Sequence, residues 1–366
     1  MKPTLVINSY AGSLSIAAQS LGSKVVGSYE DCGYGVAAQK LNYPKIDYRD
    51  TREDWPKKPD LDGVLVIAHP PCAAFSQQNI ANNNPALMGV EANSFGPHKL
   101  VLDYALRGGC SGLAIESVQG AIKALPVYQK YAKKFGYNVF TVKLNAITFG
   151  LPQWRPRVWF LFSKKKDLAT RYAPECRPIA DIVMKKGTID QYVPFYERTI
   201  ANLVKSGISR KRIMSEVFDG EPGTMFARVK KLYGDEVYDR WMASDRVVFK
   251  NYYPRMLSME EWAPCVLHDC VWMVPGRLLY VEEYERIMGF PEGWQWPANM
   301  YRQFKIYLSK GVCPPIAAWV LKTLNQQEKN CNLELRSDVI NDLQINKARV
   351  RELIKNRNKK GAYAFE

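Results

Sequence analysis

The sequence predicts an α/β fold, built as a doubly wound and mostly parallel sheet with a second, smaller mixed domain. Apolar runs of strand length alternate with helical stretches from residue 4 to about 162. Such alternation is typical of a parallel sheet with helices on both faces. Several of the runs end at a polar or reactive residue. Because parallel strands end at one edge of a sheet, these residues predict a site along that edge.

The elements follow one another in a regular order. A strand is expected at 5–7, and a Gly/Ser turn and a helix over 15–21 follow it. Further strands are expected at 25–29, ending at Glu30; at 64–68, ending at the turn that holds Cys72; at 113–115, ending at Glu116; and at 158–162. Helix-like patterning returns over 278–291 and 311–321.

Changes in composition divide the chain into four parts. The segment 164–275 is rich in Lys, Arg, Tyr and Trp and less regular, which predicts a separate mixed domain between two parts of the main domain, 1–163 and 276–325. The last part, 326–366, is polar and basic and keeps a helical period, so a terminal helical extension is expected there.

Composition and charge bound the class of protein. A chain of 366 residues can bury a large core, and a hydrophobic content of 47% is typical of a folded protein. The net charge of +15 favours a polyanionic partner such as nucleic acid over a merely soluble basic protein. No apolar stretch has membrane-spanning length, and we recognise no signal or transit peptide. We therefore expect a cytoplasmic protein that contacts no membrane.

Cysteine and histidine usage argues against a metal site. The eight cysteines include no CxxC pair, which fits reduced thiols in a cytosol. The group Cys265, His268 and Cys270 lacks a fourth ligand at zinc spacing, so we interpret it as structural and expect no metal. Since there are only three histidines, acid–base chemistry that depends on histidine is disfavoured.

Cys72 is the strongest candidate for a reactive group. It lies in Pro70-Pro71-Cys72-Ala73-Ala74-Phe75-Ser76, directly after an apolar strand. The two prolines stiffen the turn and fix the direction of the sulfur. The alternative is a small buried hydrophobe, which is the usual role of a free cysteine. A core cysteine, however, has no need of a rigid turn, so a nucleophile is favoured.

Taken together, the motifs resemble the DNA (cytosine-5) methyltransferase family over nearly the whole chain and in the family's order. The resemblance rests on Ser9-Tyr10-Ala11-Gly12-Ser13, Glu30, Asp50, Pro71-Cys72 with Phe75-Ser76, Glu116-Ser117-Val118, Gln153-Trp154-Arg155-Pro156-Arg157, Arg277-Leu278 with Glu282, Gly289-Phe290-Pro291 and Gly311-Val312-Cys313-Pro314-Pro315. It implies a Rossmann-like, S-adenosylmethionine-dependent methyltransferase fold, in which 164–275 is the target-recognition domain.

The resemblance also implies a chemistry and a role for each residue. A cytosine flips out of double-stranded DNA, and the Cys72 thiolate, its pKa lowered by arginines and helix ends, adds to carbon 6. Glu116 supplies a proton at N3, Arg157 holds O2, and Arg155 holds the ring or a phosphate. Ser76 and Gln153 are expected to contact DNA. The residues expected to bind the donor are Tyr10, Gly12, Ser13, Glu30, Asp50, Pro71, Lys310 and Gly311.

Four positions depart from the family pattern, and one of them, Ser309, stands for a Gly. Ser117 stands for an Asn, which predicts a looser surrounding of the site without loss of activity, and Asp31 stands where an aromatic ring often stacks on adenine. Lys310 stands for an Asn beside the methionine end of the donor. A second cation near a sulfonium is repulsive, by up to about 4 kcal/mol at 4 Å and an effective dielectric of 20. Carboxy-S-adenosylmethionine, whose transferred group carries a carboxylate, removes this conflict and gives 5-carboxymethylcytosine. Alternatively, Lys310 points to solvent or pairs with the carboxylate of the ordinary donor.

Two other functions remain open. A transfer RNA cytosine-5 methyltransferase shares the core chemistry, although the sizeable variable domain favours duplex DNA. A catalytically silent DNA-binding relative is the other, and the intact set Cys72, Glu116, Arg155 and Arg157 argues against it. We expect a monomer in a bacterial or phage-infected cell, serving restriction–modification or the protection of viral DNA.

Overall fold

The computed structural model describes most of the region before residue 168 and parts of the chain up to residue 325. The described residues are 1–31, 33–51, 55, 59–76, 88–168, 254–256, 263, 265–266, 271–274, 277–279, 281–297 and 304–325. Most of the predicted mixed domain and all of the predicted extension lie outside this set, so the three boundaries between the four parts stay predictions. No helix among the described residues is long and apolar enough to cross a membrane.

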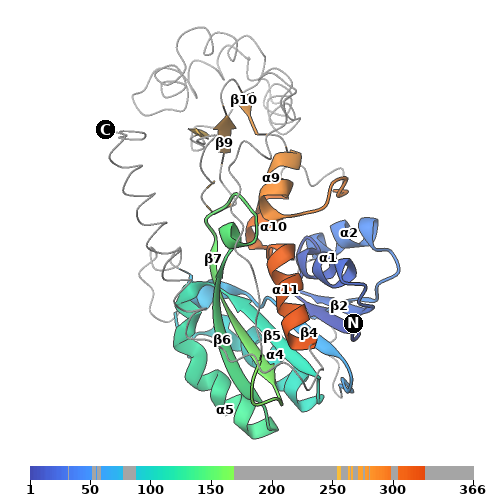
Figure 1. Cartoon of the computed structure of the whole chain (residues 1–366), viewed down its shortest axis with the longest axis vertical. Coiled ribbons are helices and arrows are strands. Elements are labelled where there is room, and N and C mark those ends of the chain that lie inside the picture. The colour runs from blue at the N-terminus through green and yellow to red at the C-terminus, as the bar shows by residue number, and fades with distance from the viewer. Residues whose placement is uncertain are drawn as a thin grey trace, which may run out of the picture.

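Seven strands form the main sheet, in the order β3-β2-β1-β4-β5-β7-β6 (Figure 1). They are β1 (Thr4–Ile7), β2 (Val25–Glu30), β3 (Tyr48–Asp50), β4 (Leu65–Ala68), β5 (Gly112–Ser117), β6 (Asn138–Asn145) and β7 (Pro156–Ser163). The first five pair in parallel, and β7 is antiparallel to both of its neighbours. The predicted doubly wound, mostly parallel sheet is therefore confirmed.

Helices cover both faces of this sheet (Figure 1). The helices among the described residues are α1 (Ser13–Ser20), α2 (Gly33–Asn42), α4 (Gly96–Arg107), α5 (Leu125–Phe135), α9 (Val281–Met288), α10 (Phe304–Lys310) and α11 (Pro314–Asn325). Along β1, Val6 packs into the apolar cluster that contains α1 and α11, whereas Leu5 and Ile7 pack into the cluster that contains α4 and α5. Burial on both faces explains why the strands are continuous apolar runs.

The last strand pair differs from the sequence expectation. The sequence predicts the strand at 158–162 without its direction, and it does not predict β6 at all. The structure joins β6 to β7 through a short segment with one 3-10 turn, Ala146–Thr148. Because no crossover helix lies between them, β7 must return antiparallel. A second sheet of three strands, β8 (Pro254–Met256), β9 (Val271–Val274) and β10 (Arg277–Leu278), lies among the later described segments.

The order of the strands reverses between β1 and β4, which is the place where open α/β sheets form their ligand crevice. The chain moves from β1 outward through β2 to β3, and from β4 in the other direction to β5. In open α/β sheets, ligands bind at such a reversal, outside the carboxyl ends of the strands. The loop after β1 and the turn that holds Cys72 both follow strands at this point. The predicted site residues therefore gather at one edge.

Candidate active site

The loop after β1 is strained in a way that is typical of ligand-binding loops. Asn8 and Tyr10 have φ angles of 56° and 52°, and Gly12 has 99°. Side chains other than glycine rarely adopt this region, and such strain concentrates at functional sites. At Gly12 a Cβ atom would also lie 3.0 Å from the ring of Trp294. The loop ends at Ser13, where α1 begins.

Glu30 lies beneath this loop, at the end of β2, and is fully buried. Its carboxylate accepts four hydrogen bonds, from the Ser9 and Tyr10 amides (2.8 and 3.1 Å), the Ser28 hydroxyl (3.0 Å) and Gln39 Nε2 (2.9 Å). Burial raises its pKa from 4.5 to about 7, and the four donors act against this rise. In this arrangement the carboxylate of Glu30, which is expected to bind the donor, holds the backbone of the loop after β1.

Asp50 lies beside Glu30 on the neighbouring strand. It ends β3 and is paired in register with Glu30 across the parallel strands. Its side chain is only partly buried. A carboxylate in this position can accept a hydrogen bond from a hydroxyl or amino group at the crevice. The sequence-predicted donor residues Tyr10, Glu30 and Asp50 therefore do lie at one edge of the sheet.

Cys72 begins a short 3-10 turn, Cys72–Phe75, after β4. The preceding carbonyl of Pro71 lies 3.2 Å from His98 Nε2, and His98 Nδ1 lies 2.6 Å from the hydroxyl of Tyr128. A carbonyl only accepts, so Nε2 bears the proton and Nδ1 accepts from the hydroxyl. Burial lowers the pKa of His98 to about 4, which keeps the ring neutral. His98 and Tyr128 hold the turn of the nucleophile, and the sequence indicates neither.

The expectation of a lowered thiol pKa at Cys72 is wrong. Burial, with the nearby charge of Glu116, raises the pKa of Cys72, while Arg157 and Arg155 act in the opposite direction. Burial wins because a charged sulfur loses its hydration in the crevice. The resting form is therefore the thiol.

Glu116 lies near the end of β5, next to β4, and is fully buried. Its Oε1 lies 3.1 Å from Arg157 Nε and its Oε2 lies 3.1 Å from His69 Nε2. Among the described residues, neither oxygen has a partner aligned for a hydrogen bond. Burial raises the pKa of Glu116, and the two arginines lower it less. A buried carboxyl group with a raised pKa can hold a proton and donate it.

His69 is a second neighbour that the sequence did not indicate. It follows β4, and its amide donates to the Ile7 carbonyl at 3.0 Å. Burial first, and then the positive charges of Arg155 and Arg157, lower its pKa to about 3. Its ring meets the ring of Tyr10 edge-on at 5.5 Å. The neutral imidazole therefore lies between the loop after β1 and Glu116.

Arg155 does not take the position that the resemblance implies. Its side chain is 1% exposed, and Nη2 donates to the carbonyls of Ser309 (2.8 Å) and Gly311 (2.6 Å). Nη1 lies 3.2 Å from Cys265 Sγ. The guanidinium group thus fixes the backbone around Lys310, and most of its donors are used within the protein. Arg157, in contrast, contacts Glu116 directly.

Cys265 joins the two arginines. Arg157 Nη2 lies 3.7 Å from its sulfur, and both arginines lower the pKa of its thiol. The other members of the proposed structural group, His268 and Cys270, lie outside the described residues. Within those residues, no group of three or more potential ligands could hold a metal ion.

Gln153 is also used inside the protein. Its Nε2 donates to the Ile287 carbonyl (3.1 Å) and lies 3.2 Å from the sulfur of Met288. Its Oε1 accepts from the Val266 amide at 3.0 Å. The Gln153 side chain thus links α9 to the backbone at Val266. Because it is fully buried, it is not accessible for the expected contact with DNA. Ser76, the other expected DNA contact, ends the Cys72 turn and is partly exposed.

Lys310 lies beside the beginning of α1. It ends α10 and is exposed, and it forms no ion pair within the described part of the chain. Two residues further on, the Val312 amide donates to Ser13 Oγ at 3.1 Å. A Cβ atom at Gly311 would lie 3.6 Å from the same oxygen. Ser13, Lys310 and Gly311, all predicted to bind the donor, therefore lie close together.

Comparisons with known proteins bear on the family and the fold of the chain. The family model described as C-5 cytosine-specific DNA methylase matches residues 113–326. The type II methyltransferase M.NlaX of Neisseria lactamica is 24% identical over 200 residues, which are 53% of this chain and 54% of that protein. The chain thus spans about half the length of this curated relative.

Solved structures share the fold. A prophage-encoded E. coli protein described as a DNA modification methyltransferase is similar with a TM-score of 0.58 at 16% identity, over 88% of this chain and 98% of that chain. The S. pombe Dnmt2 methyltransferase gives 0.57 at 14%, with the same coverage. The Entamoeba histolytica methyltransferase EhMeth gives 0.56 at 12%, again over 88% and 98%. The predicted Rossmann-like methyltransferase fold is confirmed.

Proposed function

The chain belongs to the C-5 cytosine-specific DNA methylase family, and from this premise we propose that it transfers a one-carbon-centred group from an S-adenosylmethionine-type donor to carbon 5 of cytosine in double-stranded DNA. One observation carries the proposal. Cys72 follows β4, Glu116 lies near the end of the neighbouring parallel strand β5, and Arg157 contacts the carboxyl group of Glu116. A nucleophile and a buried acid then face the same space.

The chemistry assigns a step to each of these residues. Carbon 5 of cytosine is a poor nucleophile, and addition of the Cys72 sulfur to carbon 6 moves electron density onto it. Glu116 donates its proton at N3, which neutralises the charge that develops on the ring. Because the resting group at Cys72 is a thiol, its ionisation belongs to the complex with DNA, where the charges of Arg155 and Arg157 favour the thiolate. Carbon 5 then takes up the one-carbon group as the bond from that group to the donor sulfur breaks, and the donor leaves as a neutral thioether. Loss of the carbon 5 proton to solvent, with return of the N3 proton to Glu116, releases the sulfur of Cys72 as a thiolate.

The residues at the crevice fit a nucleoside donor. The buried indole nitrogen of Trp294 has no hydrogen-bond partner among the described residues, and its ring lies against Gly12. The carboxylate of Asp50 lies at the same edge, next to Glu30. Tyr10, Gly12, Ser13, Asp50 and Gly311 would hold the donor, with Glu30 shaping the loop beneath it. When bound, the donor supplies an electrophilic carbon on a sulfonium.

Lys310 supports a second candidate for the donor. The Arg155 guanidinium group fixes the carbonyls on both sides of Lys310, and the following residues contact Ser13 at the start of α1. The Lys310 ammonium group forms no ion pair among the residues that the structure describes, and a cation beside the donor repels a sulfonium and attracts a carboxylate. This favours carboxy-S-adenosylmethionine, with 5-carboxymethylcytosine as the product. The simpler alternative is that the ammonium group points to solvent or pairs with the carboxylate of ordinary S-adenosylmethionine.

Mass spectrometry of nucleosides tests both parts. Duplex DNA is incubated with the protein and with each donor separately, and then with both in competition. A methyl increment on cytosine with the ordinary donor alone supports a conventional methyltransferase and leaves Lys310 incidental. A carboxymethyl increment that prevails in competition supports the charged donor. Transfer RNA serves as the alternative substrate, and modification of RNA alone would contradict the assignment to DNA.

The Lys310→Asn variant tests the charge argument. We expect it to shift the competition toward ordinary S-adenosylmethionine, because it removes the cation that would pair with the transferred carboxylate. Lys305 is on the same helix, α10, and a Lys305→Asn variant is the matched control for the loss of one charge. An unchanged donor preference in Lys310→Asn would contradict the argument.

A further inference from the structure

Six lysines that the proposed reaction does not use lie around the far edge of the sheet. Three are on α5 and three follow β7: Lys130, Lys133, Lys134, Lys164, Lys165 and Lys166. We call this group the lysine edge. All six side chains are exposed, and none forms an ion pair within the described residues. Asp167 is the only acidic residue in the sequence from 117 to 168. A second acidic residue, Asp62, lies close enough for its charge to help raise the pKa of Tyr137.

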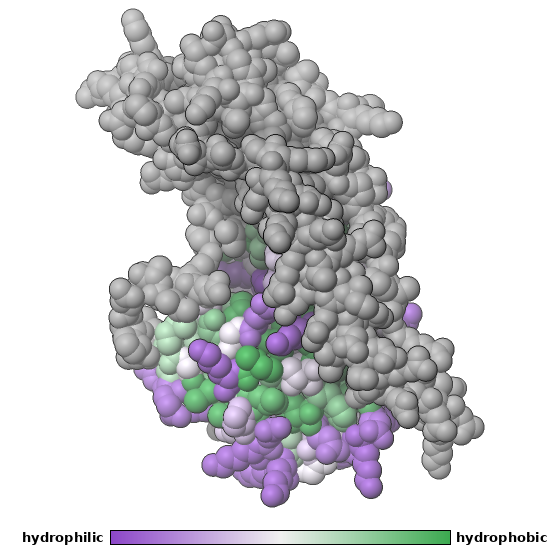
Figure 2. Space-filling model, turned by 60° about the vertical axis from the view of Figure 1, so that its left-hand side comes forward, coloured by the Kyte–Doolittle hydropathy of each residue, from purple (hydrophilic) through white to green (hydrophobic). Residues whose placement is uncertain are grey.

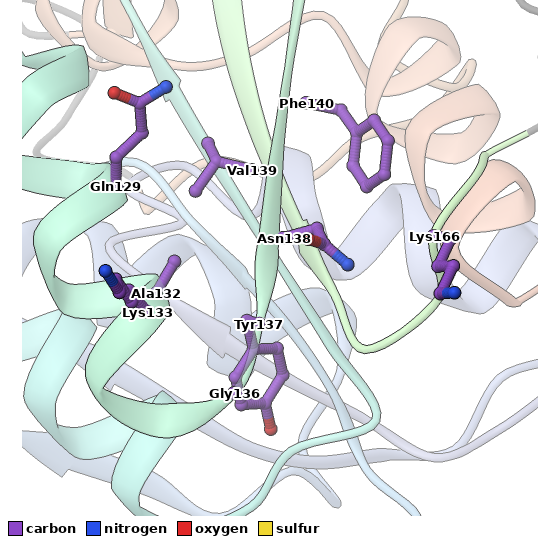
Figure 3. A pocket seen from close by; sticks show the side chains of 9 residues that line it. All are labelled: Gln129, Ala132, Lys133, Gly136, Tyr137, Asn138, Val139, Phe140 and Lys166. Atoms are coloured by element: carbon purple, nitrogen blue, oxygen red, sulfur yellow. The ribbon is translucent and has the colours of Figure 1, made fainter.

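A groove of about 670 Å³ runs through the lysine edge (Figure 3). Lys133 and Gln129 reach it from α5, Asn138 and Phe140 from β6, and Lys166 from the segment after β7. The ammonium group of Lys164 lies 5.3 Å from the centre of the Tyr137 ring, and this cation–π contact favours its position next to the groove. Cations, amide groups and aromatic rings in one groove are the side chains that nucleic acid backbones meet. Figure 2 shows hydrophilic residues gathered at the lower end, where Figure 1 places α5.

The lysine edge lies opposite the catalytic edge. Because β7 runs against the parallel strands, its last residue, Ser163, lies at their amino ends. Arg157 and Ser163 are six residues apart on this strand, which corresponds to about 20 Å. A duplex whose flipped base reaches Cys72 lies against the carboxyl edge. The lysines therefore face a different stretch of DNA.

An ordinary solvated surface explains this pattern poorly. Protein surfaces mix charges of both signs, because like charges at one place repel each other. Lysines also protect the edges of sheets from pairing with other chains, and β6 is the last strand of this sheet. That role explains lysines on a strand. It does not explain the three on α5, which pair with no acid among the described residues.

We propose that the lysine edge binds the phosphate backbone of a second segment of double-stranded DNA, while the first segment occupies the catalytic edge. The inference rests on the proposed DNA substrate. With two binding surfaces, the protein passes from one duplex to another without first becoming free. Competitor DNA then speeds its departure from a bound duplex.

The test compares two triple variants with equal loss of charge. The first, Lys133→Gln/Lys164→Gln/Lys166→Gln, removes the two lysines that line the groove and Lys164, which lies over the ring of Tyr137. The control, Lys24→Gln/Lys40→Gln/Lys45→Gln, removes three exposed lysines near β2 and β3, at the other end of the sheet. The control includes Lys40, which lies over the ring of Tyr48 much as Lys164 lies over that of Tyr137. Dissociation from a labelled duplex is followed while an unlabelled duplex is increased.

We expect the dissociation rate of the unmodified protein and of the control to rise with competitor concentration. In the groove variant this rise falls at least fivefold, and trapping on 5-fluorocytosine duplex is unchanged. The salt slope of binding to the second segment also falls by about 0.9 for each phosphate that the variant no longer neutralises. The proposal is overturned if the dissociation rate rises equally with competitor concentration in the groove variant and in the control. It is also overturned if the dissociation rate of the unmodified protein does not depend on competitor concentration. If the groove variant self-associates while its transfer between duplexes is unchanged, the lysines protect the edge of the sheet from pairing with other chains, and the proposal is wrong. Failure of the unmodified protein to bind or modify DNA would contradict the proposed function itself.

Discussion

The buried carboxyl group of Glu30 makes the stability of the fold depend on pH. Its pKa rises from 4.5 to about 7 on folding, so the native state binds more protons than the unfolded state between these values. The stability that this group contributes is therefore complete below pH 4.5 and is lost as the pH rises through about 7. At about 1.36 kcal/mol per pKa unit, a shift of this size amounts to about 3 kcal/mol.

Glu30→Gln removes this titration and keeps the shape of the side chain. We expect the free energy of unfolding of the unmodified protein to fall by about 3 kcal/mol more than that of the variant between pH 5 and pH 8. Urea unfolding without donor or DNA measures both. At pH 5 the two proteins are expected to be similar, because each then carries a neutral group that meets the Ser9 and Tyr10 amides.

Glu285→Gln is the matched control. Burial also raises the pKa of Glu285 to about 7, and this side chain accepts from Trp296 Nε1, away from the loop after β1. The Glu285→Gln variant should lose only the part of the pH dependence of the free energy of unfolding that Glu285 causes. The part that Glu30 causes should remain. Parallel stability curves for Glu30→Gln and the unmodified protein would refute the reasoning, and would mean that the four donors keep Glu30 ionised.

Two further predictions concern the catalytic edge. Glu116→Gln cannot donate a proton in the same way, so adduct formation on a 5-fluorocytosine duplex should slow by about 10²–10⁴-fold, measured on denaturing gels; a rate within twofold of the unmodified protein would remove Glu116 from the role of acid. Tyr128→Phe leaves His98 Nδ1 without its hydrogen-bond donor. We expect the free energy of unfolding in urea to fall by about 1–3 kcal/mol, and adduct formation to slow because the Pro71 carbonyl is held less firmly. Unchanged stability together with an unchanged rate of adduct formation would contradict the assigned tautomer.

The sequence predicts the site well where strands are buried on both faces. The strands at β1 and β4 are continuous apolar runs, and β2 and β5 begin with short apolar runs, so their carboxyl ends can be predicted directly. The edge strand β6 has alternating exposure and carries polar residues, so no apolar run marks it. The direction of β7 depends on the connection before it, which local pattern does not encode.

Interactions between distant parts of the chain are what the sequence does not supply. Arg155 meets carbonyls 154 and 156 residues away, and His98 meets Pro71 and Tyr128 across 27 and 30 residues. The sequence predicts the shift of the thiol pKa at Cys72 with the wrong sign, because motifs indicate neighbouring charges but not the degree of burial. For the same reason it predicts that Gln153 contacts DNA.

Covalent trapping tests the central claim most directly. The protein is incubated with a duplex that contains 5-fluorocytosine and with either donor, and the mass of the denatured product is measured. We expect a stable complex of one chain with one DNA strand, with the link located at Cys72 by peptide mapping, and no complex with Cys72→Ser. An unmodified protein that alkylates cytosine without ever being trapped, or a Cys72→Ser variant that still forms the adduct, would contradict it.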